Sequence, residues 1–179
     1  MPSRADLPIA VLHEHPDWFR PFFAELDRRG IPYERLDAAA HRYEPGADDA
    51  PWSLVVNRAS PSAYLRGGRQ STFHTLHWLR HLERLGVPVV NGSAAYALEI
   101  SKAAQLDLLA ELGLPFPRAR AINHASQAVA AARGLRWPVL VKANVGGSGA
   151  GIASFPDEAS LAAAADAGLL DLGVDGTAL

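Results

Sequence analysis

The residues best suited to chemistry lie in the stretch PVLVKANVGGSGAGIASF, which runs from residue 138 to residue 155. Four glycines fall within six positions, between two apolar runs that predict strands, and one run carries Lys142. Glycine lets a backbone approach a ligand closely, and successive N–H groups can then cradle phosphate oxygens. The spacing lacks the Lys-Ser/Thr pair of a Walker A loop and opens no helix. We interpret the stretch as a hairpin with a glycine-rich tip, either a phosphate-binding loop or an ordinary mobile turn.

Lysine is rare in this chain, because only Lys102 and Lys142 occur among the seventeen basic residues. Lysine supplies a compact point charge, whereas arginine supplies a rigid planar fork. In the predicted strand, Val139 and Val141 share one face and Lys142 lies on the other. An ammonium in so apolar a strand is costly to bury without an anion, although a residue at a sheet edge can also extend to water. Beside the glycine hairpin, phosphate is the favoured partner of Lys142.

Lys102 lies where a helix could begin, with Ser101 as its N-cap. An anion bound there would use the free N–H groups of the first turn. The alternative is one continuous helix, in which Glu99 and Lys102 form an ion pair three residues apart. Taken alone, these residues slightly favour the continuous helix.

Three histidines, His74, His77 and His81, follow one another on one face of a predicted helix. Such a row could bind zinc, but a single straight helix rarely supplies three ligands to one ion, and no carboxylate is placed to help. A polar, partly exposed face is therefore the favoured interpretation.

Other candidates follow predicted strands, and ligands of open α/β sheets bind beyond the carboxyl ends of strands. We expect these residues to be substrate-site candidates: His13, His15, Asn57, Arg58 and Ser60.

The elements that position these residues change character near residue 93. Up to that point, strands alternate with helices, which predicts an α/β fold with a small parallel sheet covered on both faces. The predicted strands span residues 8–15, 31–38, 52–60 and 87–93, and the helices span residues 16–30 and 71–86. From residue 94, we predict a small α+β lobe. Its elements begin with a helical region over 94–113, either continuous or divided near residue 101. They continue with a proline-edged strand at 114–122, a short helix at 124–134, the hairpin, and a helix at 157–167.

Composition excludes several classes of protein. A net charge of −2 without a basic, aromatic-rich face gives no reason to expect nucleic acid. No apolar run approaches the ~20 residues of a membrane span. The first residues lack a signal-peptide core, so we expect a cytoplasmic protein. No cysteine is present, which rules out disulfides and thiolate metal sites. The final residues, LLDLGVDGTAL, look like the beginning of another strand, and we expect that the chain is cut short.

The segment NGSAAYALEISKAAQLDLLAELGLPFPRARAI, followed by WPVLVKANVGGSGAGI, resembles the ATP-grasp superfamily. The likeness is closest to its RimK-like and glutathione-synthetase-like carboxylate–amine ligases. Those proteins show a lysine at the start of a helix, a GLPxP strand, and a P-V-V-V-K-P strand that leads into a glycine-rich lid. The likeness covers about residues 87–179, whereas residues 1–93 resemble the preceding domain of such proteins only in pattern. Ser101 replaces the usual aspartate and Ala143 the usual proline.

The resemblance implies that residues 1–93 form a pre-ATP-grasp α/β domain. Residues 94–179 would form the N-terminal lobe of an ATP-grasp domain, incomplete at its C-terminus. Lys102 and Lys142 would bind ATP phosphates, with Lys142 also near the adenine, beneath a glycine-rich lid. The lid residues are Gly146, Gly147, Ser148, Gly149 and Gly151.

The activity implied is ATP-dependent joining of a small-molecule or peptide carboxylate to an amine through an acyl phosphate. Mg²⁺ is the expected second cofactor, and its ligands would lie beyond Leu179, so the chain alone is expected to be inactive. Two alternatives remain open. One is a non-catalytic module that binds nucleotide or docks on a partner, and the other is a flavodoxin-like small-molecule binder formed by residues 1–93.

Overall fold

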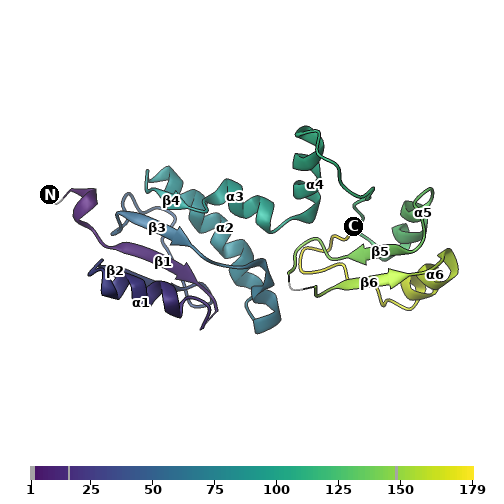
Figure 1. Cartoon of the computed structure of the whole chain (residues 1–179), viewed down its shortest axis with the longest axis horizontal. Helices are drawn as coiled ribbons and strands as arrows, with labels where there is room; N and C mark the ends of the chain where they lie inside the picture. The colour runs from purple at the N-terminus through teal and green to yellow at the C-terminus, as the bar shows by residue number, and fades with distance from the viewer. Residues whose placement is uncertain (1–2, 16, 148) are drawn as a thin grey trace. The chain divides into compact units, whose positions relative to one another are not determined.

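The computed structural model describes residues 3–15, 17–147 and 149–179 and divides into two compact units, Met1–Ala97 and Leu98–Leu179. The first unit is built on a four-stranded sheet with the order β2-β1-β3-β4, in which every pairing is parallel (Figure 1). The strands are β1 (Ile9–His13), β2 (Tyr33–Asp37), β3 (Leu54–Asn57) and β4 (Val89–Val90). The α/β class with a small parallel sheet is thus confirmed.

The central strand β1 is buried on both faces, because Ala10, Val11 and Leu12 are all inaccessible to solvent. This burial matches its apolar sequence and its position between two parallel neighbours. One face packs on α1 (Arg20–Arg28), which contributes Phe23 and Leu26 to a cluster with Val11. Pro21 is tolerated there because it lies in the first turn of the helix, where no N–H partner is required.

The remaining helices of this unit follow the third and fourth strands. The 3-10 turn η1 (Arg4–Asp6) precedes β1, and the 3-10 turn η2 (Pro61–Arg66) follows β3 directly before α2 (Arg69–Arg84). Helix α2 buries Trp78, Leu79 and Leu82, and the left-handed Gly86 follows its end. Helix α3 (Ser93–Glu99) begins at the end of the unit.

The second unit holds a two-stranded antiparallel hairpin, β5 (Val139–Lys142) with β6 (Ile152–Phe155). Its helices are α4 (Lys102–Glu111), α5 (Ala128–Ala132) and α6 (Glu158–Asp166), with a 3-10 turn η3 (Ala125–Gln127) before α5. Val139 and Val141 point into an apolar cluster with Leu161 of α6, whereas Leu140 on the opposite face is exposed. The alternation predicted for this strand is confirmed.

Two predictions about this unit need comment. The continuous helix across residue 101 is wrong, because Ser101 is extended (φ −139°, ψ 108°) and separates α3 from α4. The two-segment alternative is confirmed. The strand at 114–122 is also wrong: only Ile122 forms a β-bridge there, with Ala178. Two prolines in that segment lack the N–H that a ladder requires, and residues 111–121 are exposed.

The last described residues pair with two segments at once. The N–H and C=O of Leu179 bond to the C=O and N–H of Lys142 at 2.8 and 2.9 Å. Ala178 exchanges bonds of 2.8 and 2.9 Å with Ile122 in the same way. The extended character predicted for this segment is therefore present as isolated bridges. None of the described helices is long and apolar enough to cross a membrane.

Candidate functional site

The glycine-rich tip joins β5 to β6 as an antiparallel hairpin, as predicted. Gly149 and Gly151 have φ angles of 74° and 68°, which side chains rarely adopt. A Cβ at Gly151 would also lie 2.8 Å from Oδ2 of Asp171 and 3.1 Å from the Cβ of Ala143. Glycine is therefore required at residue 151 by backbone angle and by space. Ser148, predicted as part of the lid, lies outside the described residues.

Lys102 connects the first turn of α4 to this tip. Its Nζ donates to the backbone oxygens of Asn144, at 3.1 Å, and Gly146, at 3.3 Å. Gly146 and Gly147 are half-buried at the start of the turn. The Lys102 ammonium thus ties the start of α4 to the base of the glycine-rich tip, and it also lines a cavity of this unit.

The N–H groups at the start of α4 already have partners. The Lys102 N–H donates to the Asn144 backbone oxygen at 3.3 Å, and the Ala103 N–H donates to Asn144 Oδ1 at 2.9 Å. The Ala104 N–H donates to Ser101 Oγ at 3.2 Å, which confirms Ser101 as the N-cap. The expectation that this turn offers free N–H groups to an anion is therefore wrong. The protein's own loop satisfies them.

Asn144 is the centre of this arrangement, and sequence reasoning missed its role. Its side chain is buried, and the residue is only 6% exposed. Besides the Ala103 N–H, its Oδ1 accepts the Ser101 hydroxyl at 3.3 Å, and its Nδ2 donates to Oδ2 of Asp175 at 2.7 Å. One amide therefore holds the helix start, the glycine hairpin and the Asp175 loop together. The only signal in the sequence was a polar residue directly after an apolar strand.

Lys142 has a different environment from Lys102. It is half-buried, and among the residues that the structure describes no hydrogen bond or ion pair reaches its ammonium. Burial lowers the pKa of Lys102, the nearby charge of Lys142 lowers it further, and Asp175 partly offsets both effects. Two ammonium groups that repel each other in a partly desolvated place favour an anion between or beside them.

Both lysines line a cavity of 790 Å³ in the second unit. Its other cations are Arg118, Arg120 and Arg136, and none of the lining residues is acidic. Arg118 Nη1 donates to the Gly134 oxygen at 3.2 Å, and Arg120 Nη1 donates to the Arg133 oxygen at 2.9 Å and to the Ala131 oxygen. The walls of this cavity are mainly apolar, and its charged side chains are all positive. Such a cavity suits an organic polyanion.

The histidine row of α2 does not gather ligands for a metal. Within the described parts of the chain, no three His, Asp or Glu side chains form a group that could hold a metal ion. Instead, His74 Nε2 lies 3.0 Å from Nδ1 of His41, a pair separated by 33 residues that the sequence did not indicate. His77 is exposed and His81 is half-buried, which confirms the partly exposed face.

The candidates at the carboxyl ends of β1 and β3 divide into two groups. Asn57 is buried and structural, since its Nδ2 donates to the Asn91 oxygen at 3.0 Å and its Oδ1 accepts the Ala59 N–H at 3.0 Å. His13 lies against the ring of Phe23, with centroids 5.3 Å apart. The Asn57 amide is therefore used within the protein, whereas Nδ1 of His13 is buried and has no hydrogen-bond partner among the described residues.

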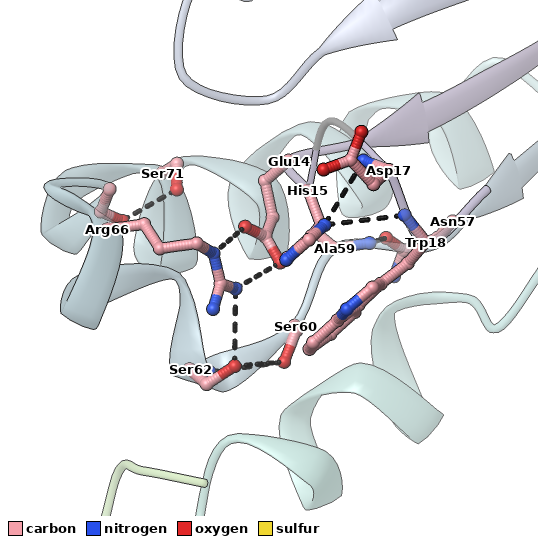
Figure 2. A network of polar contacts seen from close by, with 11 residues as sticks. Glu14, His15, Asp17, Trp18, Asn57, Ala59, Ser60, Ser62, Arg66 and Ser71 are labelled. Carbon is pink, nitrogen blue, oxygen red and sulfur yellow. Dashed lines mark hydrogen bonds and ion pairs between the residues drawn. The ribbon is translucent and has the colours of Figure 1, made fainter. Parts of the chain in front are cut away.

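The second group is His15, Arg58 and Ser60, of which His15 and Ser60 belong to the polar network drawn in Figure 2. His15 stacks on Trp18 at 4.0 Å, and the Ser60 hydroxyl lies 2.9 Å from that of Ser62. The Arg58 guanidinium lies over the ring of Phe19, 5.1 Å from its centroid.

The network contains a pair of residues that sequence reasoning missed. Arg66 forms a two-point ion pair with Glu14, at 2.9 Å from Nε and 2.6 Å from Nη2. The partners are 52 residues apart, so no local pattern pointed to them. Figure 2 shows this pair between His15 and Ser62, within one cluster at the strand ends.

Two kinds of similarity to known proteins are found. A protein-family sequence model matches part of the second unit, and solved structures match nearly the whole chain in fold. Residues 101–172 match the protein family described as the carbamoyl-phosphate synthase L chain, ATP binding domain. No curated protein sequence matches the chain.

Three solved structures illustrate the shared fold. The RimK domain ATP-grasp protein from Sphaerobacter thermophilus is 20% identical, with a TM-score of 0.72, and the match covers 96% of this chain and 61% of that chain. The N5-carboxyaminoimidazole synthase from Aspergillus clavatus, solved with ADP, is 15% identical over 97% of this chain and 46% of that chain, with a TM-score of 0.60. The D-alanine–D-alanine ligase from Helicobacter pylori is 15% identical over 89% and 59% of the two chains, with a TM-score of 0.52.

The chain spans 61% or less of the length of these three proteins, and at such identities the likeness concerns the fold. It combines a parallel α/β sheet with a small antiparallel pair, in the order that the motifs predicted. The chain therefore has the fold of the N-terminal part of ATP-grasp proteins, and its residues 101–172 match an ATP-binding domain of that superfamily.

Proposed function

We propose that the second unit binds the phosphates of ATP through Lys102, Lys142 and the glycine-rich tip. In this proposal residues 1–93 are the pre-ATP-grasp domain, and residues 94–179 are the first lobe of an ATP-grasp domain. The tip residues are Gly146, Gly147, Ser148, Gly149 and Gly151.

One observation carries the proposal: Lys142 is half-buried without a described partner, at the edge of a cavity whose charged lining is entirely positive. An ammonium without a partner beside such a cavity is stabilised by a phosphate. Adenine and ribose would occupy the apolar part of the cavity, and the triphosphate would lie toward the two lysines. The residues present therefore fit a nucleoside triphosphate.

The two lysines have separate tasks in this proposal. Lys142 contacts phosphate directly and spreads its charge, which is the electrostatic part of catalysis. Lys102 holds the base of the tip through two backbone oxygens and adds a second positive charge beside the same phosphates. Gly149 and Gly151 give the tip the left-handed angles needed to fold over a ligand.

The reaction that we propose for the complete protein is the joining of a carboxylate to an amine. ATP would supply the phosphoryl group that activates the carboxylate as an acyl phosphate, and the amine would displace phosphate. Mg²⁺ would be required beside the phosphates. The described residues hold no group of carboxylates suited to it, so we expect residues 1–179 alone to bind nucleotide without turnover.

Isothermal titration with ATP tests the phosphate contact. Replacing Lys142 with methionine keeps the length of the side chain and removes its charge. A lost hydrogen bond to a charged group costs about 1.5–3 kcal/mol, so ATP should bind roughly tenfold to a hundredfold more weakly to Lys142→Met. Arg133→Met is the matched control, because Arg133 is an exposed cation of the same unit outside the cavity lining.

The result that contradicts the proposal is equal ATP affinity in the wild-type chain and Lys142→Met, or equal losses in both variants. A second candidate function is a non-catalytic nucleotide-binding or docking module. It is favoured because no three His, Asp or Glu side chains among the described residues form a group that could hold a metal ion. Both functions predict no turnover by residues 1–179 when ATP is incubated with carboxylate and amine mixtures. Amide formation by residues 1–179 would contradict that expectation and would rule out the module.

A further inference from the structure

We propose that the carboxyl ends of β1 and β3 bind a carboxylate attached to a flat apolar group, with Arg66 as the anion-binding residue. The inference rests on the proposed function in one respect, since it gives the acid substrate of that reaction a chemical class. Its physical basis lies wholly in the first unit and can be tested without ATP.

Arg66 is held in place before any ligand arrives. Its Nε lies 2.9 Å from Oε2 of Glu14, and its Nη2 lies 2.6 Å from Oε1 of Glu14 and 3.2 Å from Oγ of Ser62. The Glu14 side chain is only 4% exposed, whereas that of Arg66 is 29% exposed. Both oxygens of Glu14 are occupied, so Glu14 positions the guanidinium and is not itself available to a ligand.

The orientation of Arg66 leaves one nitrogen for recognition. A guanidinium has five N–H donors, and the three contacts above use only Nε and Nη2. Among the described residues no hydrogen bond reaches Nη1, which keeps two donors (Figure 2). A positively charged donor group binds a carboxylate oxygen more strongly than it binds an uncharged acceptor, because both partners of the hydrogen bond are then ionised.

An exposed aromatic surface lies next to this donor. Trp18 is 53% exposed, which is unusual for so large an apolar side chain, and the Arg66 Cζ lies 5.2 Å from its ring centroid. His15 stacks on the indole at an interplanar angle of 6°. This arrangement provides a flat surface for a flat group beside an anchored cation.

His15 adds a second donor to the same place. Its Nδ1 accepts the N–H groups of Asp17 and Trp18 at 3.2 and 3.3 Å. An acceptor at Nδ1 puts the proton of the neutral ring on Nε2, which is then a donor. Arg66 and His15 thus both offer N–H donors beside Trp18, close to the carboxyl ends of the strands, where ligands of parallel α/β folds bind.

The test uses sodium benzoate as the probe and benzamide as its uncharged counterpart. The ¹⁵N-labelled chain of 179 residues is titrated with each at constant ionic strength. We expect benzoate to shift the Arg66 Nε–H signal and the Trp18 indole signal with saturation in the millimolar range. Benzamide has the same flat ring without the charge and should bind at least about tenfold more weakly, the smallest loss expected for a hydrogen bond to a charged group.

Variants separate recognition from folding. Arg66→Met alone would leave the buried Glu14 carboxylate unpaired, so the informative variant is Glu14→Gln with Arg66→Met, which removes both charges. This variant should lose the benzoate shifts at the Trp18 indole, and Arg80→Met, an exposed arginine of α2, should keep them. Non-saturating shifts in the wild-type chain, or equal binding of benzoate and benzamide, would overturn the inference. Either result would leave ATP binding at Lys142 unaffected.

Discussion

Replacing Asn144 with alanine should strongly destabilise the second unit. The amide makes three hydrogen bonds, to the Ala103 N–H, the Ser101 hydroxyl and the Asp175 carboxylate. Two neutral bonds contribute about 1 kcal/mol each, and one to a charged group contributes about 1.5–3 kcal/mol. The expected loss is therefore roughly 3–5 kcal/mol, a large part of the ~5–15 kcal/mol that stabilises a typical domain.

Hydrogen exchange of the β5 amides, measured together with urea unfolding, gives the free energy of unfolding of the second unit. Local measurement matters because two units need not unfold as one. Asn123→Ala is the matched control, since Asn123 is exposed and only its backbone N–H forms a hydrogen bond, to Gln127. A loss below about 1 kcal/mol in Asn144→Ala, or a similar loss in the control, would refute the idea that this amide holds the site together.

Two further predictions concern the pH and the backbone. Burial, and to a smaller extent the nearby His74, lower the pKa of His41 from 6.5 to about 4. As the pH falls, the unfolded chain therefore takes up a proton at His41 before the folded chain does. The stability that the neutral His41 contributes is complete above pH 6.5 and is lost as the pH falls toward 4. The melting temperature of the first unit should fall across that range, and His41→Phe should reduce this dependence; an unchanged slope in the variant would contradict it. Gly151→Ala should cost more than Gly134→Ala in urea unfolding. Both glycines have positive φ, which costs an alanine about 1–2 kcal/mol, but only at residue 151 would the new Cβ also meet Asp171. Equal losses of unfolding free energy in the two variants would contradict this prediction, since the contact of the new Cβ with Asp171 would then cost nothing.

The parts of the site that could be predicted from the sequence are local in the chain. The glycine hairpin, its strand alternation and the N-cap at Ser101 depend on residues within a few positions of one another, so spacing alone indicates them. Lys142 could also be singled out from the sequence, because an isolated lysine in an apolar strand is a costly choice, and it does line the cavity; its contact with phosphate stays a prediction.

The remaining parts depend on contacts between distant segments. The Glu14–Arg66 pair and the His41–His74 pair join residues 52 and 33 positions apart, and neither position has a distinctive local pattern. The prediction of free N–H groups at α4 failed for the same reason, because the group that occupies them comes from Asn144, 41 positions from Ala103. The segment at 114–122 has the composition of a strand, but a strand forms only where a neighbour supplies hydrogen bonds, and only Ile122 has one.

The arginines of the cavity also lower what ligand binding would cost. Arg118 Nη1 donates to the Gly134 oxygen at 3.2 Å, and Arg120 Nη1 donates to the Arg133 oxygen at 2.9 Å, so the backbone holds both guanidinium groups in place. A long side chain that a ligand has to immobilise loses about 0.5–1.5 kcal/mol in rotamer freedom. Because these two side chains are already ordered, a bound anion would meet donors that need little further ordering.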